Sequence, residues 1–177
     1  MIYTRIIVNN TGDEVIDLLN AMQVIKNVEF SFYDLIYLNK NGASITEDTL
    51  KIRVYQKTEL DANVLVLRKI APFVNGVKED QFLLNKKFDT EEEAVKFVKD
   101  NYDDSYEFSF KLEKIGTEYQ KEGLKIWLEN VKDIGISIEF GCEQQETIED
   151  IINLFNIKER LNISLPEYIY LKKVKKN

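Results

Sequence analysis

Several stretches of this sequence alternate apolar and polar residues with a period of two, the pattern of a β-strand with one buried face. The clearest is the stretch 50–55, in which every second residue is Leu, Ile or Val and the residues between them are Lys, Arg and Tyr. Alternation or β-rich composition predicts strands at Ile2–Val8, Val28–Leu38, Leu50–Tyr55, Val64–Ile70, 78–85, Tyr106–Leu112, Leu124–Glu129 and Ile136–Gly141. Most of the spacings suit hairpins, and Asn75-Gly76 is a turn signal, so an antiparallel sheet or barrel is expected.

Three helices are predicted between the strands, each from a capping residue followed by apolar residues at helical spacing. The predicted caps, each followed three residues later by a carboxylate, are Thr11 with Glu14, Thr90 with Glu93, and Thr147 with Asp150. The order is strand, helix, several strands, helix, several strands, helix, which predicts the α+β class. The 177 residues suit one domain spanning 1–177.

Composition excludes several classes of function. There is no histidine, which removes histidine-based hydrolases and nearly every zinc enzyme. The single cysteine, Cys142, cannot form an internal disulfide, which fits a reducing compartment. No stretch approaches the roughly 20 apolar residues of a membrane span, and no signal peptide is apparent, so a cytoplasmic protein is expected. Neither haem nor an organic cofactor is expected.

The net charge of −7 disfavours a binder of duplex nucleic acid, which usually needs a basic surface. The oligomeric state cannot be read from the sequence.

Charged residues occupy the polar positions of several predicted strands. Lys51 and Arg53 project from one strand, Arg68 lies on the next, and Glu129 and Glu139 lie on later strands. Mixed charge is also typical of a solvated sheet face, so that interpretation stays open. The alternative is that these faces line the interior of a barrel. Such an interior would suit a polyphosphate, held by Lys and Arg, with Mg²⁺ or Mn²⁺ on the carboxylates.

The order of motifs resembles the CYTH superfamily, the triphosphate tunnel proteins that include class IV adenylate cyclases and thiamine triphosphatases. The likeness extends from about Ile2 to Leu171. Phe32-Tyr33-Asp34 resembles the family's Tyr-Tyr-Asp, residues 50–53 its Leu-Arg-Ile-Arg, and residues 65–68 its Leu-Thr-Leu-Lys. Residues 128–139, which read LENVKDIGISIE, are similar without a gap to the family's Leu-Asp-x-Val-x-Gly-Leu-Gly-x-Phe-x-Glu.

The resemblance implies an eight-stranded antiparallel barrel whose basic residues hold a triphosphate and whose acidic residues hold a divalent metal. The residues that it assigns to phosphate are Arg5, Lys51, Arg53, Arg68, Lys78 and Lys111, with Lys114 replacing Lys111 in the other possible register. The residues that it assigns to Mg²⁺ or Mn²⁺ are Glu129, Glu139 and Asp80.

The sequence also departs from the family pattern at acidic positions. The family's Glu-x-Glu-x-Lys falls on Met1, Tyr3 and Arg5, and the second of its later paired glutamates falls on Gly141. Glu107 and Glu113 are candidates to compensate for these losses. Because metal-assisted phosphoryl transfer needs a fixed cation, catalysis stays open.

We therefore expect a protein that binds a triphosphorylated small molecule in a basic barrel, with metal-dependent hydrolysis as an open question. The alternatives are a catalytically inactive binding or scaffold module and a protein-interaction domain with an open, charged sheet face.

Overall fold

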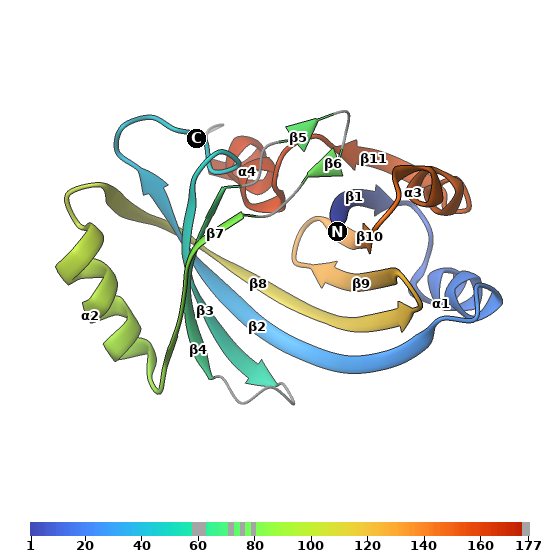
Figure 1. The fold of residues 1–177 in the computed structure, drawn as a ribbon, viewed down its shortest axis with the longest axis horizontal. Coiled ribbons are helices and arrows are strands. Elements are labelled where there is room, and N and C mark those ends of the chain that lie inside the picture. Colours follow the sequence, from blue (N-terminus) through green and yellow to red (C-terminus); the bar gives the residue numbers. More distant parts are fainter. Residues whose placement is uncertain (58–62, 71–72, 75–76, 79–80, 175–177) are drawn as a thin grey trace. The chain divides into compact units, whose positions relative to one another are not determined.

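The computed structural model describes residues 1–57, 63–70, 73–74, 77–78 and 81–174. Asp80 and the expected turn at Asn75-Gly76 lie outside this part of the chain. The strands are β1 Ile2–Val8, β2 Ile25–Asn39, β3 Thr49–Lys57, β4 Val64–Ile70, β5 Phe73–Val74, β6 Val77–Lys78, β7 Gln81–Phe88, β8 Tyr106–Lys121, β9 Leu124–Val131, β10 Gly135–Cys142 and β11 Ile157–Leu161. The helices are α1 Gly12–Ala21, α2 Glu91–Tyr102, α3 Gln145–Ile152, α4 Leu165–Ile169 and the π-helix η1 Tyr170–Val174 (Figure 1).

The strands form one antiparallel sheet, which confirms the α+β class. Their order is β5-β6-β1-β10-β9-β8-β2-β3-β4-β7, with β11 paired to β1. Seven of the eight predicted strands are each present as a single strand. The total is eleven because β11 is added, because Phe73–Val74 forms the short strand β5, and because the predicted strand 78–85 is replaced by β6 and β7.

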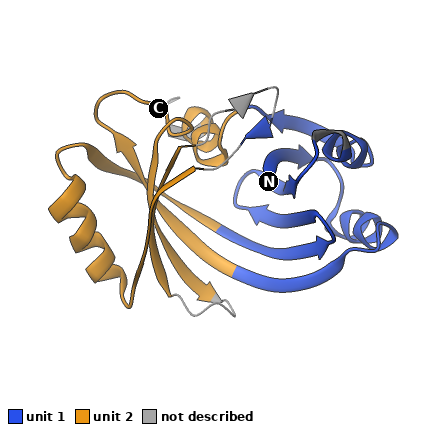
Figure 2. Ribbon diagram, in the orientation of Figure 1, with its two compact units in different colours: residues 1–30, 73–79, 114–162 blue, residues 31–72, 80–113, 163–177 orange. Residues whose placement is uncertain are grey.

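The chain divides into two compact units (Figure 2). Unit 1 comprises residues 1–30, 73–79 and 114–162, and unit 2 comprises residues 31–72, 80–113 and 163–177. The long strands β2 and β8 each run from one unit into the other. No helix of the described residues is long and apolar enough to cross a membrane.

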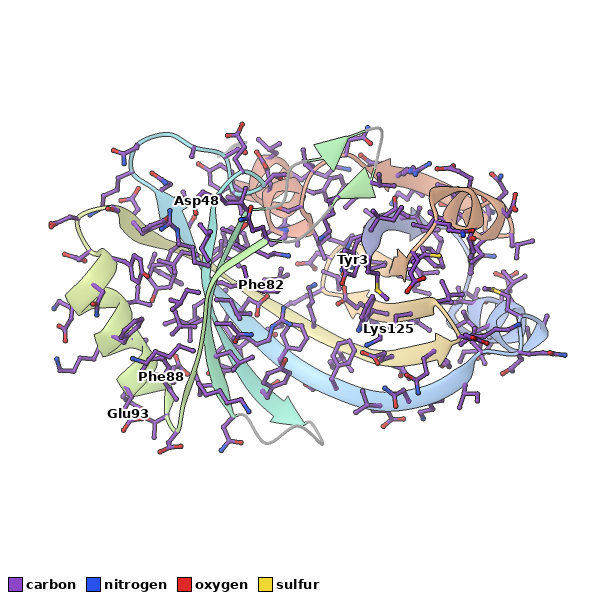
Figure 3. The ribbon with its side chains drawn as sticks, viewed as in Figure 1. Tyr3, Asp48, Phe82, Phe88, Glu93 and Lys125 are labelled. Atoms are coloured by element: carbon purple, nitrogen blue, oxygen red, sulfur yellow. The ribbon has the colours of Figure 1, made fainter. Side chains whose placement is uncertain are left out.

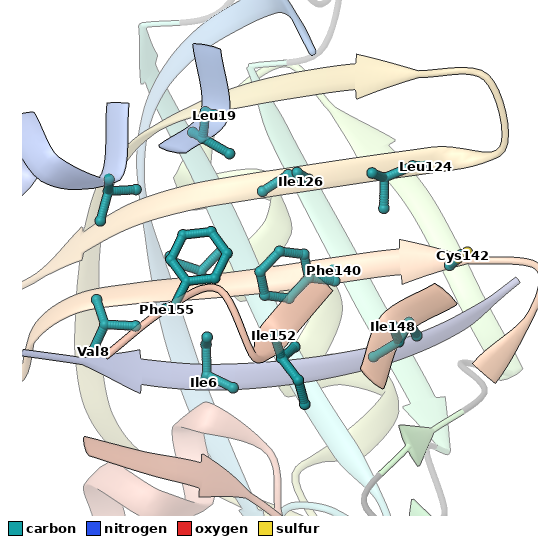
Figure 4. Packing of buried hydrophobic residues seen from close by; sticks show 12 residues of the cluster. Ile6, Val8, Leu19, Leu124, Ile126, Phe140, Cys142, Ile148, Ile152 and Phe155 are labelled. Atoms are coloured by element: carbon teal, nitrogen blue, oxygen red, sulfur yellow. The ribbon is translucent and has the colours of Figure 1, made fainter. Parts of the chain in front are cut away.

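In unit 1, α1 and α3 cover one face of the sheet. Ile6, Ile126, Ile138 and Phe140 project from β1, β9 and β10 and are fully buried. They belong to one cluster with residues of α1 and α3, and Figure 4 labels Ile6, Ile126 and Phe140 in it. Since side chains alternate along a strand, the other face of the same strands carries their odd-numbered neighbours.

In unit 2, α2 covers one face of β3 and β4. Val64, Val66 and Ile52 pack there against Ala94 and Val98 of α2. Lys51 and Arg53, which flank Ile52 on β3, therefore lie on the opposite face of the sheet.

Two of the three predicted helix starts are confirmed. Thr11 accepts a hydrogen bond from the Glu14 amide at 3.3 Å, and the Glu14 carboxylate accepts one from the Thr11 amide at 2.7 Å. Thr90 accepts from the Glu93 amide at 3.2 Å. The third helix differs, because α3 begins at Gln145 and its N-cap, Gln144, makes no side-chain capping bond.

Candidate functional site

A buried carboxylate in unit 2 holds the two basic residues of β3. Asp34 of β2 is fully buried and lies opposite Arg53 in the β2–β3 register. It accepts hydrogen bonds from Lys51 Nζ at 2.9 Å, from Arg53 Nε at 2.8 Å and from Arg53 Nη2 at 2.9 Å. The Arg53 guanidinium lies 3.8 Å from the centroid of the Phe32 ring. We call Asp34, Lys51 and Arg53 the Asp34 cluster.

The electrostatics of the Asp34 cluster keep Arg53 charged. Burial by itself lowers the pKa of Arg53, but the charge and hydrogen bonds of Asp34 outweigh burial and raise that pKa. Lys51 and Arg53 both donate to Asp34, which confirms the expectation that they project together.

Arg68 was expected on the same basic face, and the structure places it on the opposite one. It pairs with Leu50 in the β3–β4 register, and Leu50 packs in the apolar cluster under α2. Directly opposed residues of an antiparallel pair share a face, so Arg68 lies on the α2 side. Lys69, which pairs with Thr49, lies on the side of Lys51 instead. Sequence reasoning missed Lys69 because a shift of one residue reverses the face of a strand position.

Arg68 has a structural partner on the α2 side. Both carboxylate oxygens of Asp48 accept from Arg68, at 3.0 Å each, and Asp48 also accepts from Asn39 and from the Tyr106 hydroxyl. Burial acts to raise the pKa of Asp48, but these hydrogen bonds outweigh it and lower the pKa. Figure 3 labels Asp48 in this position.

The polar face of unit 1 carries a second and larger group of charges. Arg5 of β1 lies opposite Glu139 of β10, and Ser137 of β10 lies opposite Glu129 of β9. Arg5 Nη2 donates to Glu139 at 2.7 Å, and Arg5 Nη1 donates to Ser137 Oγ at 2.8 Å and to Glu129. A single guanidinium therefore joins both carboxylates that were expected to bind metal.

Two lysines complete this group. Lys114 of β8 donates to the Glu129 oxygens at 3.1 and 3.2 Å, and Lys78 of β6 lies 2.9 Å from Glu139 Oε1. Arg5, Lys78, Lys114 and Glu129 are each buried, whereas the Glu139 side chain retains 17% exposure. We call these residues the Glu129 cluster: Arg5, Lys78, Lys114, Glu129, Ser137 and Glu139.

The cations of the Glu129 cluster keep Glu129 ionised in spite of its burial. Burial acts to raise the pKa of Glu129, but the charges of Arg5 and Lys114 outweigh it and hold the pKa below the ordinary value. Burial similarly acts to lower the pKa of Arg5, but Glu129 and Glu139 raise it. The cluster is thus a network of fixed ions.

Lys111 belongs to unit 2 and has contacts within that unit. Its Nζ lies 3.8 Å from the centroid of the Tyr33 ring in unit 2 and 3.2 Å from Glu113, and it is exposed. Of the two registers left open by the sequence, the structure therefore brings Lys114 into the cluster with Glu129. Glu113 and Glu107 are both exposed.

No family model matches this sequence. No curated protein matches it either. Several solved structures, however, match this chain. The PH1819 protein of Pyrococcus horikoshii OT3 aligns over 97% of this chain and 99% of its own, with a TM-score of 0.75 and 15% identity. A candidate adenylate cyclase from Vibrio parahaemolyticus aligns over 93% of this chain and 94% of its own, with a TM-score of 0.61 and 16% identity.

A third structure is the candidate adenylyl cyclase HpAC1 from Hippeastrum, described as having a dominant triphosphatase activity. It aligns over 86% of this chain and 84% of its own, with a TM-score of 0.59 and 16% identity. The chain has the fold of the CYTH superfamily. At these identities the comparisons establish the CYTH fold and leave the activity of this chain to be argued from its own residues.

Two of the departures from the CYTH pattern meet at one place. Tyr3 and Gly141, which both fall on glutamate positions of the family, are directly opposed in the β1–β10 register. A Cβ atom on Gly141 would lie 2.9 Å from Tyr3 Cε1 and 2.9 Å from Met1 Sδ. The Tyr3 ring therefore occupies the space that a side chain at 141 would need. Figure 3 labels Tyr3 on β1.

The donor set of unit 1 does not fit the divalent metal that the CYTH fold implies. Glu129 and Glu139 both accept hydrogen bonds from Arg5, and a divalent cation about 4 Å from a guanidinium would be repelled by roughly 8 kcal/mol at an effective dielectric of about 20. Among the described residues, no group of three acidic or cysteine side chains is placed to hold a metal ion. Asp80, the third expected ligand, lies outside the described residues.

Proposed function

We propose that the chain binds a triphosphorylated small molecule, such as a nucleoside triphosphate, thiamine triphosphate or inorganic triphosphate, on the polar face of unit 1. The observation that carries this proposal is the convergence of three buried cations, Arg5, Lys78 and Lys114, on one face of β1, β10, β9 and β8. Phosphate oxygens accept the same charge-assisted hydrogen bonds from Lys and Arg as carboxylate oxygens do. A phosphate group can therefore exchange with Glu139, the more exposed of the two glutamates.

The fold supports this proposal without establishing it. One structure with the same fold is described as having triphosphatase activity, and others are candidate adenylate cyclases. Lys51 and Arg53 of the Asp34 cluster, which belong to unit 2, stay predicted phosphate-binding residues. The expected cytoplasmic location and the expected lack of duplex nucleic acid as a partner stay predictions.

Metal-dependent hydrolysis is not part of this proposal. It would need a cation at Glu129 and Glu139, and Arg5 already bonds to both. A phosphate-release assay with Mg²⁺ and with Mn²⁺ tests this point. Turnover that Glu139→Gln abolishes would show that the chain hydrolyses its ligand.

Calorimetry tests the binding proposal directly. Inorganic triphosphate, ATP and thiamine triphosphate are each titrated into the wild-type chain, Lys114→Met and Arg68→Ala. Loss of one charged hydrogen-bond donor should weaken binding by about 1–3 kcal/mol in Lys114→Met. Arg68→Ala is the matched control, because Arg68 lies on the α2 side of its sheet and should leave the affinity unchanged.

At about 1 mM ligand, even a binding free energy of about −4 kcal/mol is detected. The absence of heat with all three ligands at this concentration would therefore contradict the proposal.

The second candidate is an inactive binding or scaffold module. It is favoured by the finding that Arg5, Lys51, Arg53, Lys78 and Lys114 each contact a carboxylate of the chain itself. In that case the ion pairs only hold the sheet together. Neither triphosphate nor Mg²⁺ should then shift the melting temperature, and a protein partner that co-purifies with the chain would identify the charged face as an interaction surface.

A further inference from the structure

We propose that Arg5 takes the place of a divalent cation on the polar face of unit 1, so that this face binds free polyanions rather than their metal complexes. The absence of a divalent cation is proposed for the Glu129 and Glu139 carboxylates alone. The statement about the polyanion rests on the proposed function.

The first support is the position of the Arg5 guanidinium. It lies between the two carboxylates and donates to Glu129 from Nη1 and to Glu139 from Nη2. A metal bridging the same carboxylates would need those oxygens as ligands. Nη1 also donates to Ser137 Oγ at 2.8 Å, so the plane of the guanidinium is fixed from a third direction.

The second support is the second cation that lies beside each glutamate. Lys114 Nζ lies 3.1 Å from Glu129 Oε2, and Lys78 Nζ lies 2.9 Å from Glu139 Oε1. Each carboxylate therefore meets two cations. Three cations and two carboxylates leave the cluster with a net charge of +1, which disfavours an added divalent cation and favours an added anion.

The third support is independent of the ion pairs. Tyr3 and Gly141 are directly opposed on the same face, two residues along each strand from Arg5 and Glu139. The Tyr3 ring lies where a side chain at 141 would stand, within 2.9 Å of a Cβ atom built on Gly141. Neither position can supply a carboxylate to a metal. The positions without a carboxylate and the fixed cation thus lie on the same face of the same two strands.

This arrangement should favour the free anion over its metal complex. Mg²⁺ bound to a triphosphate cancels part of the charge that Arg5, Lys78 and Lys114 attract, so the metal complex should bind more weakly than the free anion. The affinity for inorganic triphosphate should therefore be highest with a chelator present and fall about fivefold or more when Mg²⁺ is in excess.

Mn²⁺ binding without any phosphate tests the statement about the metal. The electron paramagnetic resonance signal of free Mn²⁺ is recorded during titration of wild type and Glu139→Gln. The two titrations should superimpose. Mn²⁺ binding by wild type that Glu139→Gln removes would overturn the proposal.

Arg5→Ala supplies the converse experiment. Without the guanidinium, Glu129 and Glu139 become available, and Mn²⁺ should bind about tenfold or more tightly than to wild type. The gain should disappear in Arg5→Ala combined with Glu129→Gln. Arg5→Lys keeps a cation in place and should stay at the wild-type level. An unchanged titration in folded Arg5→Ala, judged by circular dichroism, would contradict the role of Arg5. If Arg5→Ala does not fold, the wild-type and Glu139→Gln titrations decide.

The calorimetry with chelator and with Mg²⁺ separates the two proposals. If triphosphate binds under neither condition, the proposed function fails, but the Mn²⁺ titrations still stand as the test of Arg5. If triphosphate binds only with Mg²⁺, this inference fails and the proposed function survives.

Discussion

Among single residues, Glu129 has the most demanding environment, because it is a buried carboxylate whose charge is maintained by Arg5 and Lys114. A buried ion pair adds little net stability compared with apolar residues, but removal of one partner leaves the other charge uncompensated. A change at one member of this ion-pair network therefore affects the other two, and its members are Arg5, Lys114 and Glu129.

Glu129 should make stability depend on pH. Its pKa in the folded chain lies below the ordinary value of 4.5, so the unfolded chain binds the proton more readily. The stabilisation is therefore present above pH 4.5 and is lost as the pH falls through the lower, folded-state pKa. Glu129→Gln should lose about 3–5 kcal/mol of unfolding free energy near pH 7. The difference from wild type should shrink on acidification.

Urea denaturation at a series of pH values measures both effects. Glu122→Gln is the control, because Glu122 is exposed and should change neither stability nor its pH dependence. A difference between wild type and Glu129→Gln that stayed constant from neutral to acidic pH would show that Glu129 is not held ionised by its neighbours.

At the scale of the elements, the β8–β9 pair depends on a close approach at Gly116. Gly116 lies directly opposite Glu129, and a Cβ atom there would lie 2.5 Å from the Leu128 carbonyl oxygen and 2.7 Å from Phe30 Cζ. The Phe30 ring thus covers the backbone of β8 beside Glu129. The glycine permits this packing, and the ring helps to keep water from the buried carboxylate.

Gly116→Ala should destabilise the chain by about 1–3 kcal/mol, because β8 or Phe30 must move to make room. Gly12→Ala is a matched control at the first residue of α1, where an added Cβ meets nothing within 4 Å. It should change stability by no more than about 1 kcal/mol, and in the stabilising direction. Equal effects of the two substitutions on the urea midpoint would contradict the tight packing at Gly116.

At the scale of the whole molecule, two compact units share the strands β2 and β8. Neither unit can unfold completely without the loss of part of a strand that continues into the other. The expectation of one domain over residues 1–177 therefore stays a prediction, namely that both units unfold in a single cooperative transition.

That prediction can be measured with two probes. Trp127 is the single tryptophan and belongs to unit 1, so its fluorescence reports on unit 1, whereas far-ultraviolet circular dichroism reports on the strands and helices of both units. The two denaturation curves should superimpose, as in two-state unfolding. Separate midpoints would show that the units are independent domains.

Much of the fold could be predicted from the sequence because alternation is a local signal. It gave the eight principal strands and placed Lys51 with Arg53. It could not decide between Lys111 and Lys114, because both lie in the 16-residue strand β8, at positions of opposite parity. Arg68 was placed on the wrong face for a related reason, since its pairing with Leu50 is a long-range property.

The candidate site was predictable only in part. The sequence indicated Arg5, Glu129 and Glu139, but not that they bond to one another, because side chains 124 and 134 positions apart in sequence meet only in the folded sheet. That contact converts two expected metal ligands into partners of a guanidinium. Nor does the sequence indicate that the Tyr3 ring lies over Gly141.

A crystal structure of the chain with inorganic triphosphate, grown with a chelator, would test the central claim most directly. The account predicts phosphate oxygens within hydrogen-bond distance of Lys78 and Lys114, with Glu139 displaced from Lys78 and Arg5 still bonded to Glu129. Triphosphate bound elsewhere on the chain, with the Glu129 cluster unchanged, would contradict it.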